Sequence, residues 1–192
     1  DCNTAIGACA LQANTTGANN TAVGAEALDN NTTGACNVAV GKSSFCSNTT
    51  GTCNTAIGAF ALDKATTASE TIAIGYNAMS VTTTGGVNIG IGNNVMQENT
   101  TGCLNTVVGT SGLQCNTTGK ENVVLGLQAM RFNQTGCFNV AVGRSALCGN
   151  EAGNNNTALG KNAGNAVTTG DENTLLGVDS GRSISPFTVT TE

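Results

Sequence analysis

The chain has 192 residues, of which only 10% are charged and 3% aromatic, with 26 glycines and nine cysteines. Ordinary domains carry about a quarter charged residues, so neither a conventional deep core nor a charged disordered tail is expected. The formal net charge of −5 argues against a nucleic-acid partner, which needs clustered lysine and arginine. No long apolar run is present, so no membrane span is expected.

A glycine recurs every 17 residues through eleven consecutive copies, with no insertion or deletion between them. A branched aliphatic residue always precedes it, and an asparagine almost always lies four residues before it. A large apolar residue lies four residues after it in the first nine copies, but Gly164 and Gly181 take that place in the last two, so the pattern weakens there. The consensus of one copy is N-T-A-I-G-x-x-A-L-x-x-N-T-T-G-x-x.

In chain order, each copy first predicts a short strand, because the apolar residues of Asn-Thr-Ala-Ile are spaced by two. The repeat glycine then predicts a turn, the next apolar residues a second short strand, and Asn-Thr-Thr-Gly a second turn. Such coils stack strand on strand at about 4.8 Å. The sequence therefore predicts an all-β fold over residues 1–182, a parallel β-solenoid or β-roll of eleven 17-residue coils, about 50 Å long.

Both faces of the predicted strand are apolar or small, so one face can fill the inside of the coil and the other needs a cover. We expect the residue before the repeat glycine to form the core ladder, and the small residue before that, such as Ala22, to form an outer face. The expected core ladder is Ile6, Val23, Val40, Ile57, Ile74, Ile91, Val108, Leu125, Val142, Leu159 and Leu176. Burial per coil is thin, which favours a homo-oligomer with three chains as the first choice; a monomeric roll is the alternative.

The segments Asn-Thr-Ala-Ile-Gly-Ala-Cys-Ala-Leu (3–11) and Asn-Thr-Ala-Val-Gly-Ala-Glu-Ala-Leu (20–28) resemble the head repeats of trimeric autotransporter adhesins. With its Asn-Thr-Thr-Gly linker, the repeat is also similar to arrays in tail-fibre-like proteins of phages and large viruses. The resemblance covers residues 2–181. It implies left-handed parallel β-rolls, three chains side by side, located outside the cell, on a cell surface or on a virion.

The cysteines recur at related places on either side of the repeat glycine. Three pairs share this relation and suggest disulfides within a coil, a fourth pair is added at the N-terminus, and one cysteine is left for an interchain bond or a free thiol. The pairs are Cys36–Cys46, Cys103–Cys115, Cys137–Cys148 and Cys2–Cys9, and the remaining residue is Cys53. Another pairing, such as Cys46 with Cys53, and unpaired buried thiols are the alternatives. Disulfides would indicate an oxidising, extracellular compartment.

Six asparagines begin an N-x-T sequon at one repeat position, and three more begin sequons elsewhere. The six are Asn14, Asn31, Asn48, Asn99, Asn116 and Asn133, and the other three are Asn19, Asn30 and Asn155. In a secreted protein some would carry glycans on solvent-facing turns. The alternative is turn chemistry alone, in which asparagine and threonine hydrogen-bond backbone groups.

Catalysis finds little support, because there is no histidine, no Gly-x-Ser-x-Gly elbow and no phosphate-binding loop. The acidic residues are scattered over the repeat, so no cofactor or metal site is expected. We therefore expect a non-enzymatic structural protein of an extracellular fibre, filament or viral or cell-surface appendage. It could adhere to a surface glycan or receptor. The alternative is an ice- or carbohydrate-binding solenoid that uses flat threonine and asparagine ladders.

Residues 183–192 leave the repeat and contain Pro186, Phe187 and Val189. They are expected to be a C-terminal extension, either a linker or a strand that docks on a neighbouring copy. An open coil end can pair with another chain. Head-to-tail polymerisation into a filament is therefore a further expectation.

Overall fold

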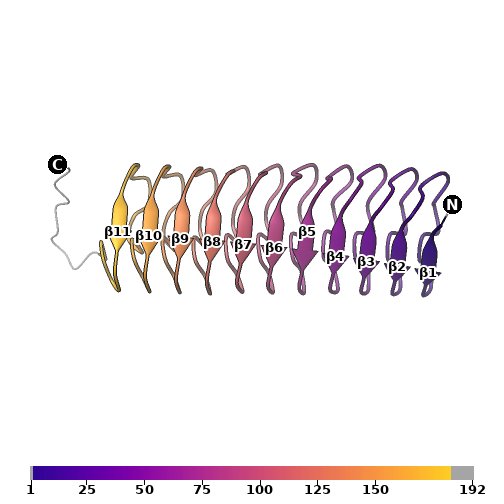
Figure 1. Cartoon of the computed structure of the whole chain (residues 1–192), viewed down its shortest axis with the longest axis horizontal. Helices are drawn as coiled ribbons and strands as arrows, with labels where there is room; N and C mark the ends of the chain where they lie inside the picture. Colours follow the sequence, from indigo (N-terminus) through magenta and orange to yellow (C-terminus); the bar gives the residue numbers. More distant parts are fainter. Residues whose placement is uncertain (1, 183–192) are drawn as a thin grey trace.

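The computed structural model describes residues 2–182, which form a straight rod of stacked coils (Figure 1). Eleven strands of three residues lie in one parallel sheet, in the order of the sequence. They are β1 (Thr4–Ile6), β2 (Thr21–Val23), β3 (Val38–Val40), β4 (Thr55–Ile57), β5 (Ile72–Ile74), β6 (Ile89–Ile91), β7 (Thr106–Val108), β8 (Val123–Leu125), β9 (Val140–Val142), β10 (Thr157–Leu159) and β11 (Thr174–Leu176). The predicted parallel β-solenoid is confirmed. The C-terminal extension expected over 183–192 lies outside the described residues.

Each strand pairs with the strand 17 residues further on, with no slip along the rod. Thr4 pairs with Thr21 and Ala5 with Ala22 at one end, and Thr157 pairs with Thr174 at the other. Each repeat position therefore forms a ladder that runs along the rod, and we number the positions 1 to 17 by the residues of the first coil. Ten steps of about 4.8 Å make the sheet roughly 48 Å long.

The small middle residue of each strand faces the interior, and the residues on either side of it face out. Ala22 and Ala39 are fully buried, whereas Ile57 is 38% exposed and Leu125 is 39% exposed. The expected core ladder at position 6 is therefore wrong, as is the outer alanine face. Ile6, Val23, Val40, Ile57, Ile74, Ile91, Val108, Leu125, Val142, Leu159 and Leu176 all lie on the outer side of the sheet, partly or well exposed.

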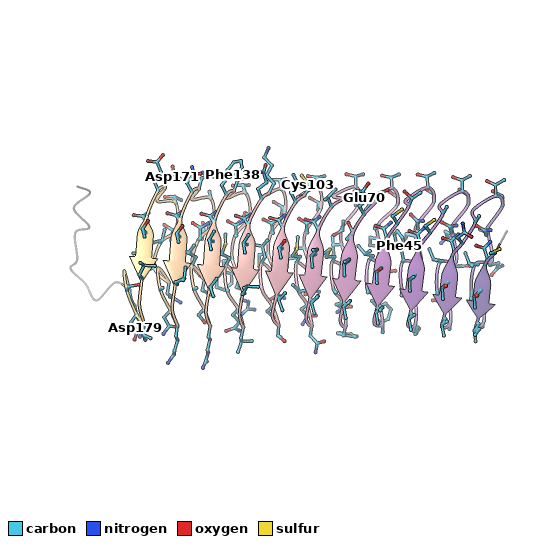
Figure 2. The ribbon with its side chains drawn as sticks, viewed as in Figure 1. Phe45, Glu70, Cys103, Phe138, Asp171 and Asp179 are labelled. Atoms are coloured by element: carbon cyan, nitrogen blue, oxygen red, sulfur yellow. The ribbon has the colours of Figure 1, made fainter. Side chains whose placement is uncertain are left out.

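The interior is filled instead by the large side chain at position 11, which reaches across the coil to the strand. Eight of these side chains are completely buried: Leu28, Phe45, Leu62, Met79, Met96, Leu113, Met130 and Leu147. Phe45 is labelled in Figure 2. A methyl group built on Gly90 of β6 would lie only 2.5 Å from Met79 Cε. The large position 11 side chain therefore takes most of the interior, and position 5 carries a small residue in most coils, with the branched residue of position 6 on the outer side.

In the sixth and seventh coils, a larger interior side chain at one position accompanies a smaller one at another. In the sixth coil Gly90 replaces the strand alanine while Val95 replaces the alanine at position 10. In the seventh coil the exchange is reversed, with Val107 on the strand and Gly112 at position 10, and a methyl group on Gly112 would lie 2.9 Å from Val107 Cγ1. The two substitutions in each coil keep the interior filled.

The same exchange explains the last two coils, where position 11 taken alone loses its large apolar residue. Gly164 and Gly181 replace the large residue at position 11, and Leu175 replaces the strand alanine between them. A methyl group on Gly164 would lie 2.6 Å from Leu175 Cδ1 and 2.8 Å from Leu147 Cδ2. Leu175 therefore fills the interior from the opposite wall, and the C-terminal coils keep the architecture.

Each coil turns at residues with left-handed backbone, at positions 2, 9 and 11 and at the repeat glycine. In the second coil these are Asn19, Glu26 and Leu28, with φ of 59°, 60° and 51°, and Gly24, with φ of 137°. The predicted second short strand is therefore wrong, because two left-handed residues at positions 9 and 11 cannot belong to an extended segment. The repeat glycine is also needed for space, since a methyl group on Gly24 would lie 2.5 Å from Gly41 O.

Candidate functional surfaces

The sequon asparagines at position 14 lie inside the rod. The Asn31 side chain is fully buried, and its Nδ2 donates hydrogen bonds to Asn14 Oδ1 at 2.8 Å and to Gly34 O at 3.0 Å. The same is true of Asn48, whose Nδ2 donates to Asn31 Oδ1 at 2.7 Å. Asn14, in the first coil, is half-buried and donates to Gly17 O at 3.0 Å.

A glycan must be attached at this same Nδ2 atom, so the folded rod has no place for glycans at the buried sequons. The predicted glycosylation is wrong for Asn31, Asn48, Asn99, Asn116 and Asn133, all of them fully buried. The alternative of turn chemistry accounts for the motif, since Asn48 also accepts a hydrogen bond from Gly51 N at 2.9 Å. The off-ladder residues Asn19, Asn30 and Asn155 are exposed. Asn30 Nδ2 donates to Cys46 O at 3.0 Å.

A second internal amide ladder runs along position 3, and the sequence analysis assigned it no role. Asn37 N donates to Asn20 Oδ1 at 3.0 Å, and Asn37 Nδ2 donates to Gly51 O at 2.8 Å. Thr71 interrupts this ladder but keeps its connection, because Thr71 N donates to Asn54 Oδ1 at 3.0 Å. Buried amides that are hydrogen-bonded from coil to coil in this way bind each coil to the next.

The two threonines of each Asn-Thr-Thr-Gly turn have different environments. The hydroxyl at position 15 donates to a backbone carbonyl of the next coil, as from Thr15 to Thr32 O and from Thr32 to Thr49 O, both at 2.9 Å. The threonine at position 16 is exposed in the first eight coils. This row is Thr16, Thr33, Thr50, Thr67, Thr84, Thr101, Thr118 and Thr135. The position 15 hydroxyls are therefore engaged between coils, whereas the position 16 threonines form a continuous exposed row.

The outer strand face, which we define as positions 4 and 6 of all eleven strands, is a flat surface without a charged residue. Position 6 carries the branched aliphatic row described above. Position 4 carries Thr4, Thr21, Val38, Thr55, Ile72, Ile89, Thr106, Val123, Val140, Thr157 and Thr174. Away from the rod ends, Ile72 is 36% exposed and Val108 is 40% exposed. The face measures about 48 Å by 10 Å, on the order of 500 Å², toward the upper end of what monomers leave exposed.

All nine cysteines are free in the structure, so none of the predicted disulfides is present. Cys2 and Cys9 belong to the ladders of Glu70 and Asp179, which lie at opposite edges of the rod (Figure 2). In the third coil Cys36 is exposed and directly precedes Asn37, and Cys46 is half-buried and lies two residues before Asn48. The neighbouring Asn37 and the nearby Asn48 both donate to Gly51 O, at 2.8 and 3.1 Å.

The pairs Cys103–Cys115 and Cys137–Cys148 lie at similar but not identical positions in later coils and are also unbonded. Spacing along the chain suggested these pairs, but none of them is bonded in the structure.

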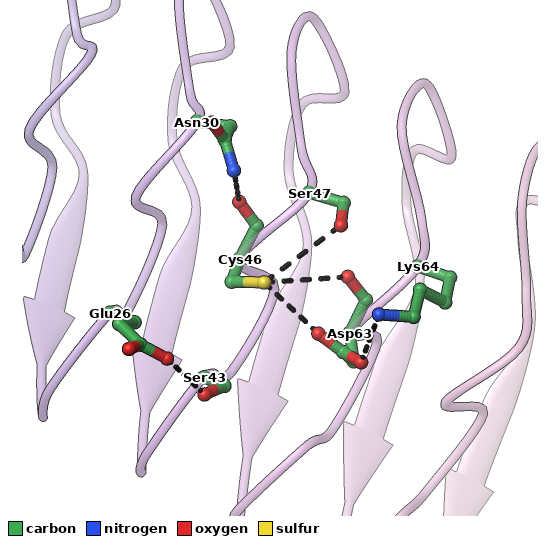
Figure 3. Close-up of polar contacts among 7 residues, drawn as sticks. All are labelled: Glu26, Asn30, Ser43, Cys46, Ser47, Asp63 and Lys64. Carbon is green, nitrogen blue, oxygen red and sulfur yellow. Dashed lines mark hydrogen bonds and ion pairs between the residues drawn. The ribbon is translucent and has the colours of Figure 1, made fainter.

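Cys46 lies in a polar cluster that joins the third and fourth coils (Figure 3). Its thiol donates a hydrogen bond to Asp63 Oδ1 at 3.0 Å, and Lys64 Nζ lies 2.9 Å from Asp63 Oδ2. Burial, and then the hydrogen bond to Asp63, raises the pKa of Cys46 from 9.0 to about 11. The thiol therefore stays protonated at neutral pH and is a poor nucleophile.

Cys115 and Cys148, two other residues of the predicted disulfides, also have raised thiol pKa values. Burial is the largest cause that raises the pKa of Cys115 and of Cys148 above the ordinary value. Among residues 2–182, no group of three or more histidine, cysteine, aspartate or glutamate residues is placed to hold a metal ion. Over the same range, no helix is long and apolar enough to cross a lipid bilayer.

The chain was compared with models of protein families, with curated proteins and with solved structures, and no match was found. The geometry of the rod and its surfaces is therefore the basis for the function proposed below.

Proposed function

We propose that the chain is a non-enzymatic, rod-shaped structural segment of an extracellular fibre or of a viral or cell-surface appendage, working as a homo-oligomer. The observation that carries this proposal is the unbroken 17-residue register of all eleven strands. A rod with this register has a length set by the number of coils. Such a part is suited to hold two objects at a fixed distance.

The internal ladders support a load-bearing role. Neighbouring coils are joined by strand hydrogen bonds, by the amides of positions 3 and 14 and by the hydroxyls of position 15. Between the second and third coils these include Asn37 N to Asn20 Oδ1, Asn48 Nδ2 to Asn31 Oδ1 and Thr32 Oγ1 to Thr49 O. Each contributes on the order of 1 kcal/mol net. Bonds parallel to the rod axis at several places around the coil resist both stretching and bending.

The outer strand face supports self-association. Two copies that cover this face would bury roughly 1,000 Å² in total, about the smallest area of a specific interface. The face is uncharged along its whole length, so burying it leaves no ionised side chain without water or a partner. Three chains around an axis agree with the resemblance to adhesin heads and tail fibres, and we propose this number. The contact then uses positions 4 and 6, in place of the alanine face at position 5 that the sequence analysis expected on the outside.

Sedimentation equilibrium and electron microscopy of the purified chain test this proposal. The expected result is a rod with three chain masses. Val108→Glu, in the middle of the outer strand face, should convert it to monomer. Thr118→Glu, an equally drastic change on the exposed threonine row, should leave the mass unchanged. A parent chain that stays monomeric at high micromolar concentration would contradict the homo-oligomer, and a compact particle would contradict the rod.

Ice or carbohydrate binding is the second candidate, and one observation favours it. The outer strand face presents threonine and branched aliphatic side chains in two flat rows, with rungs about 4.8 Å apart. The asparagine ladders play no part, because they are buried. Thermal hysteresis at micromolar concentration, abolished by Val108→Glu and retained by Thr118→Glu, would establish ice binding through this face. An inactive parent chain would exclude it.

A further inference from the structure

Two of the nine cysteines lie directly one above the other along the rod. Cys36 and Cys53 occupy position 2 of the third and fourth coils, both are exposed, and their φ angles are 59° and 60°. Cys36 N donates to Ala18 O at 3.0 Å and Cys53 N donates to Ala35 O at 3.1 Å, which holds both residues in the coil ladder. No other two cysteines share a position in successive coils.

The spacing of this pair is set by the fold. Residues with the same backbone conformation in neighbouring coils are related by one step of about 4.8 Å, so their Cβ atoms are separated by the same distance. A relaxed disulfide needs Cβ atoms roughly 3.5–4.5 Å apart and sulfurs about 2.05 Å apart. Taking the zinc–thiolate bond length of roughly 2.3 Å as the scale of a metal–sulfur bond, an ion held linearly between two thiolates separates the sulfurs by about 4.6 Å. The coil step therefore fits a bridging ion better than a sulfur–sulfur bond.

We propose that Cys36 and Cys53 form a two-coordinate site for a soft monovalent cation of the Cu(I) class. Thiolate ligands select such ions over Mg²⁺ or Ca²⁺. On binding, each thiol loses its proton to water and each sulfur forms one bond to the ion, with no change of oxidation state. The inference stands on the coil geometry and is independent of the proposed structural role.

The surroundings fit two ligands. The same ladder continues to Asn19 on one side and to Glu70 on the other, neither of which is a sulfur ligand. No group of three acidic, cysteine or histidine side chains suited to a metal occurs within residues 2–182, so the four-ligand site that structural zinc requires is not formed there. Linear coordination by two sulfurs satisfies Cu(I) with the ligands present.

The reduced chain, titrated with Cu(I) against a chromophoric Cu(I) chelator, tests the site. One equivalent should be withdrawn from the chelator, and Cys36→Ser or Cys53→Ser should each lower the affinity at least tenfold. Cys103→Ser should leave it unchanged, because that cysteine has no neighbour in the adjacent coil. Circular dichroism of each variant should match that of the parent, since all the replaced side chains reach the surface.

Two rearrangements separate the effect of spacing from that of thiol number. Cys53→Ser combined with Glu70→Cys keeps nine thiols but puts the pair two coils apart, and it should abolish tight binding. Lys120→Cys, which fills the coil between Cys103 and Cys137, should create an additional site. X-ray absorption of the loaded parent should show two sulfur ligands.

Unchanged affinity in Cys36→Ser would overturn the proposal, as would tight binding by the variant with separated cysteines. Three or more ligands at the ion would also overturn it. Complete conversion of Cys36 and Cys53 to a disulfide by oxidised glutathione in the folded chain would show that the spacing argument is wrong.

Discussion

Replacing one buried amide in the middle of the position 14 ladder tests whether the internal ladders hold the rod together. In the structure, Asn116 Nδ2 donates to Asn99 Oδ1 at 2.8 Å and to Gly119 O at 3.0 Å, and Asn116 Oδ1 accepts from Asn133 Nδ2 at 2.8 Å. Asn116→Ala removes all three hydrogen bonds. It also leaves acceptors of the neighbouring residues in a site closed to water, because Asn99, Asn116 and Asn133 are completely buried.

The expected loss follows from these contacts. Three hydrogen bonds at about 1 kcal/mol each, with some added penalty for unpaired buried partners, amount to about 3–4 kcal/mol in the free energy of unfolding. Urea unfolding followed by circular dichroism measures it, with Thr118→Ala of the exposed row as the matched control, expected within about 0.5 kcal/mol of the parent. A loss below about 1 kcal/mol for Asn116→Ala would refute the reasoning, because the amide ladder would then contribute less than a single ordinary hydrogen bond.

Three further predictions follow from the interior and from the Cys46 cluster. Gly164→Leu should overpack the interior against Leu175 and destabilise by about 1–3 kcal/mol, and Leu175→Ala in the same chain should restore most of the loss; thermal unfolding measures both. Thr82→Asn should stabilise the rod by up to about 1 kcal/mol in urea unfolding, because it replaces a buried hydroxyl that has no partner and rejoins the amide ladder. Iodoacetamide should modify Cys46 appreciably only as the pH approaches 11, and Asp63→Asn should lower the pH at which modification becomes half-maximal. Rapid modification of Cys46 at pH 8 would contradict the assigned hydrogen bond.

The same thiol gives the fold a pH dependence whose sign is determined by the raised pKa. The folded chain holds the Cys46 proton more tightly than the unfolded chain, with a pKa of about 11 against 9.0. Its contribution to stability is therefore complete below pH 9 and is lost as the pH rises from 9 to about 11. Unfolding measured across this range should show a steeper loss in the parent than in Cys46→Ala.

The repeat alone predicts the solenoid, its 17-residue period and its parallel register, because stacking tolerates no insertion. The side of the strand that faces inward was not predictable in the same way. Both faces are apolar, and the choice depends on Leu28 and its equivalents, whose left-handed backbone sends a large side chain across the interior. The exchange of Gly90 with Val95 carried the relevant signal, since paired size changes mark positions that share a space.

The asparagine and cysteine predictions failed for one common reason. Sequons and disulfide pairs were read along the chain, whereas most contacts in the rod run from one coil to the next. A tabulation by ladder would have shown that position 14 holds only asparagine, alanine, threonine or valine and never a charged residue, which indicates burial. It would also have placed Cys36 next to Cys53.

The most direct test of this architecture is the labelling of two adjacent strand residues in a background without other cysteines. Ala73, in β5, is fully buried, whereas Ile74 lies on the outer strand face. The test uses the monomeric Val108→Glu background, in which the outer strand face is uncovered. The expected result is that Ile74→Cys reacts quickly with a water-soluble maleimide in this folded monomer, while Ala73→Cys reacts only after unfolding. Fast labelling of Ala73→Cys together with protection of Ile74→Cys in the folded monomer would mean that the coil is turned the other way.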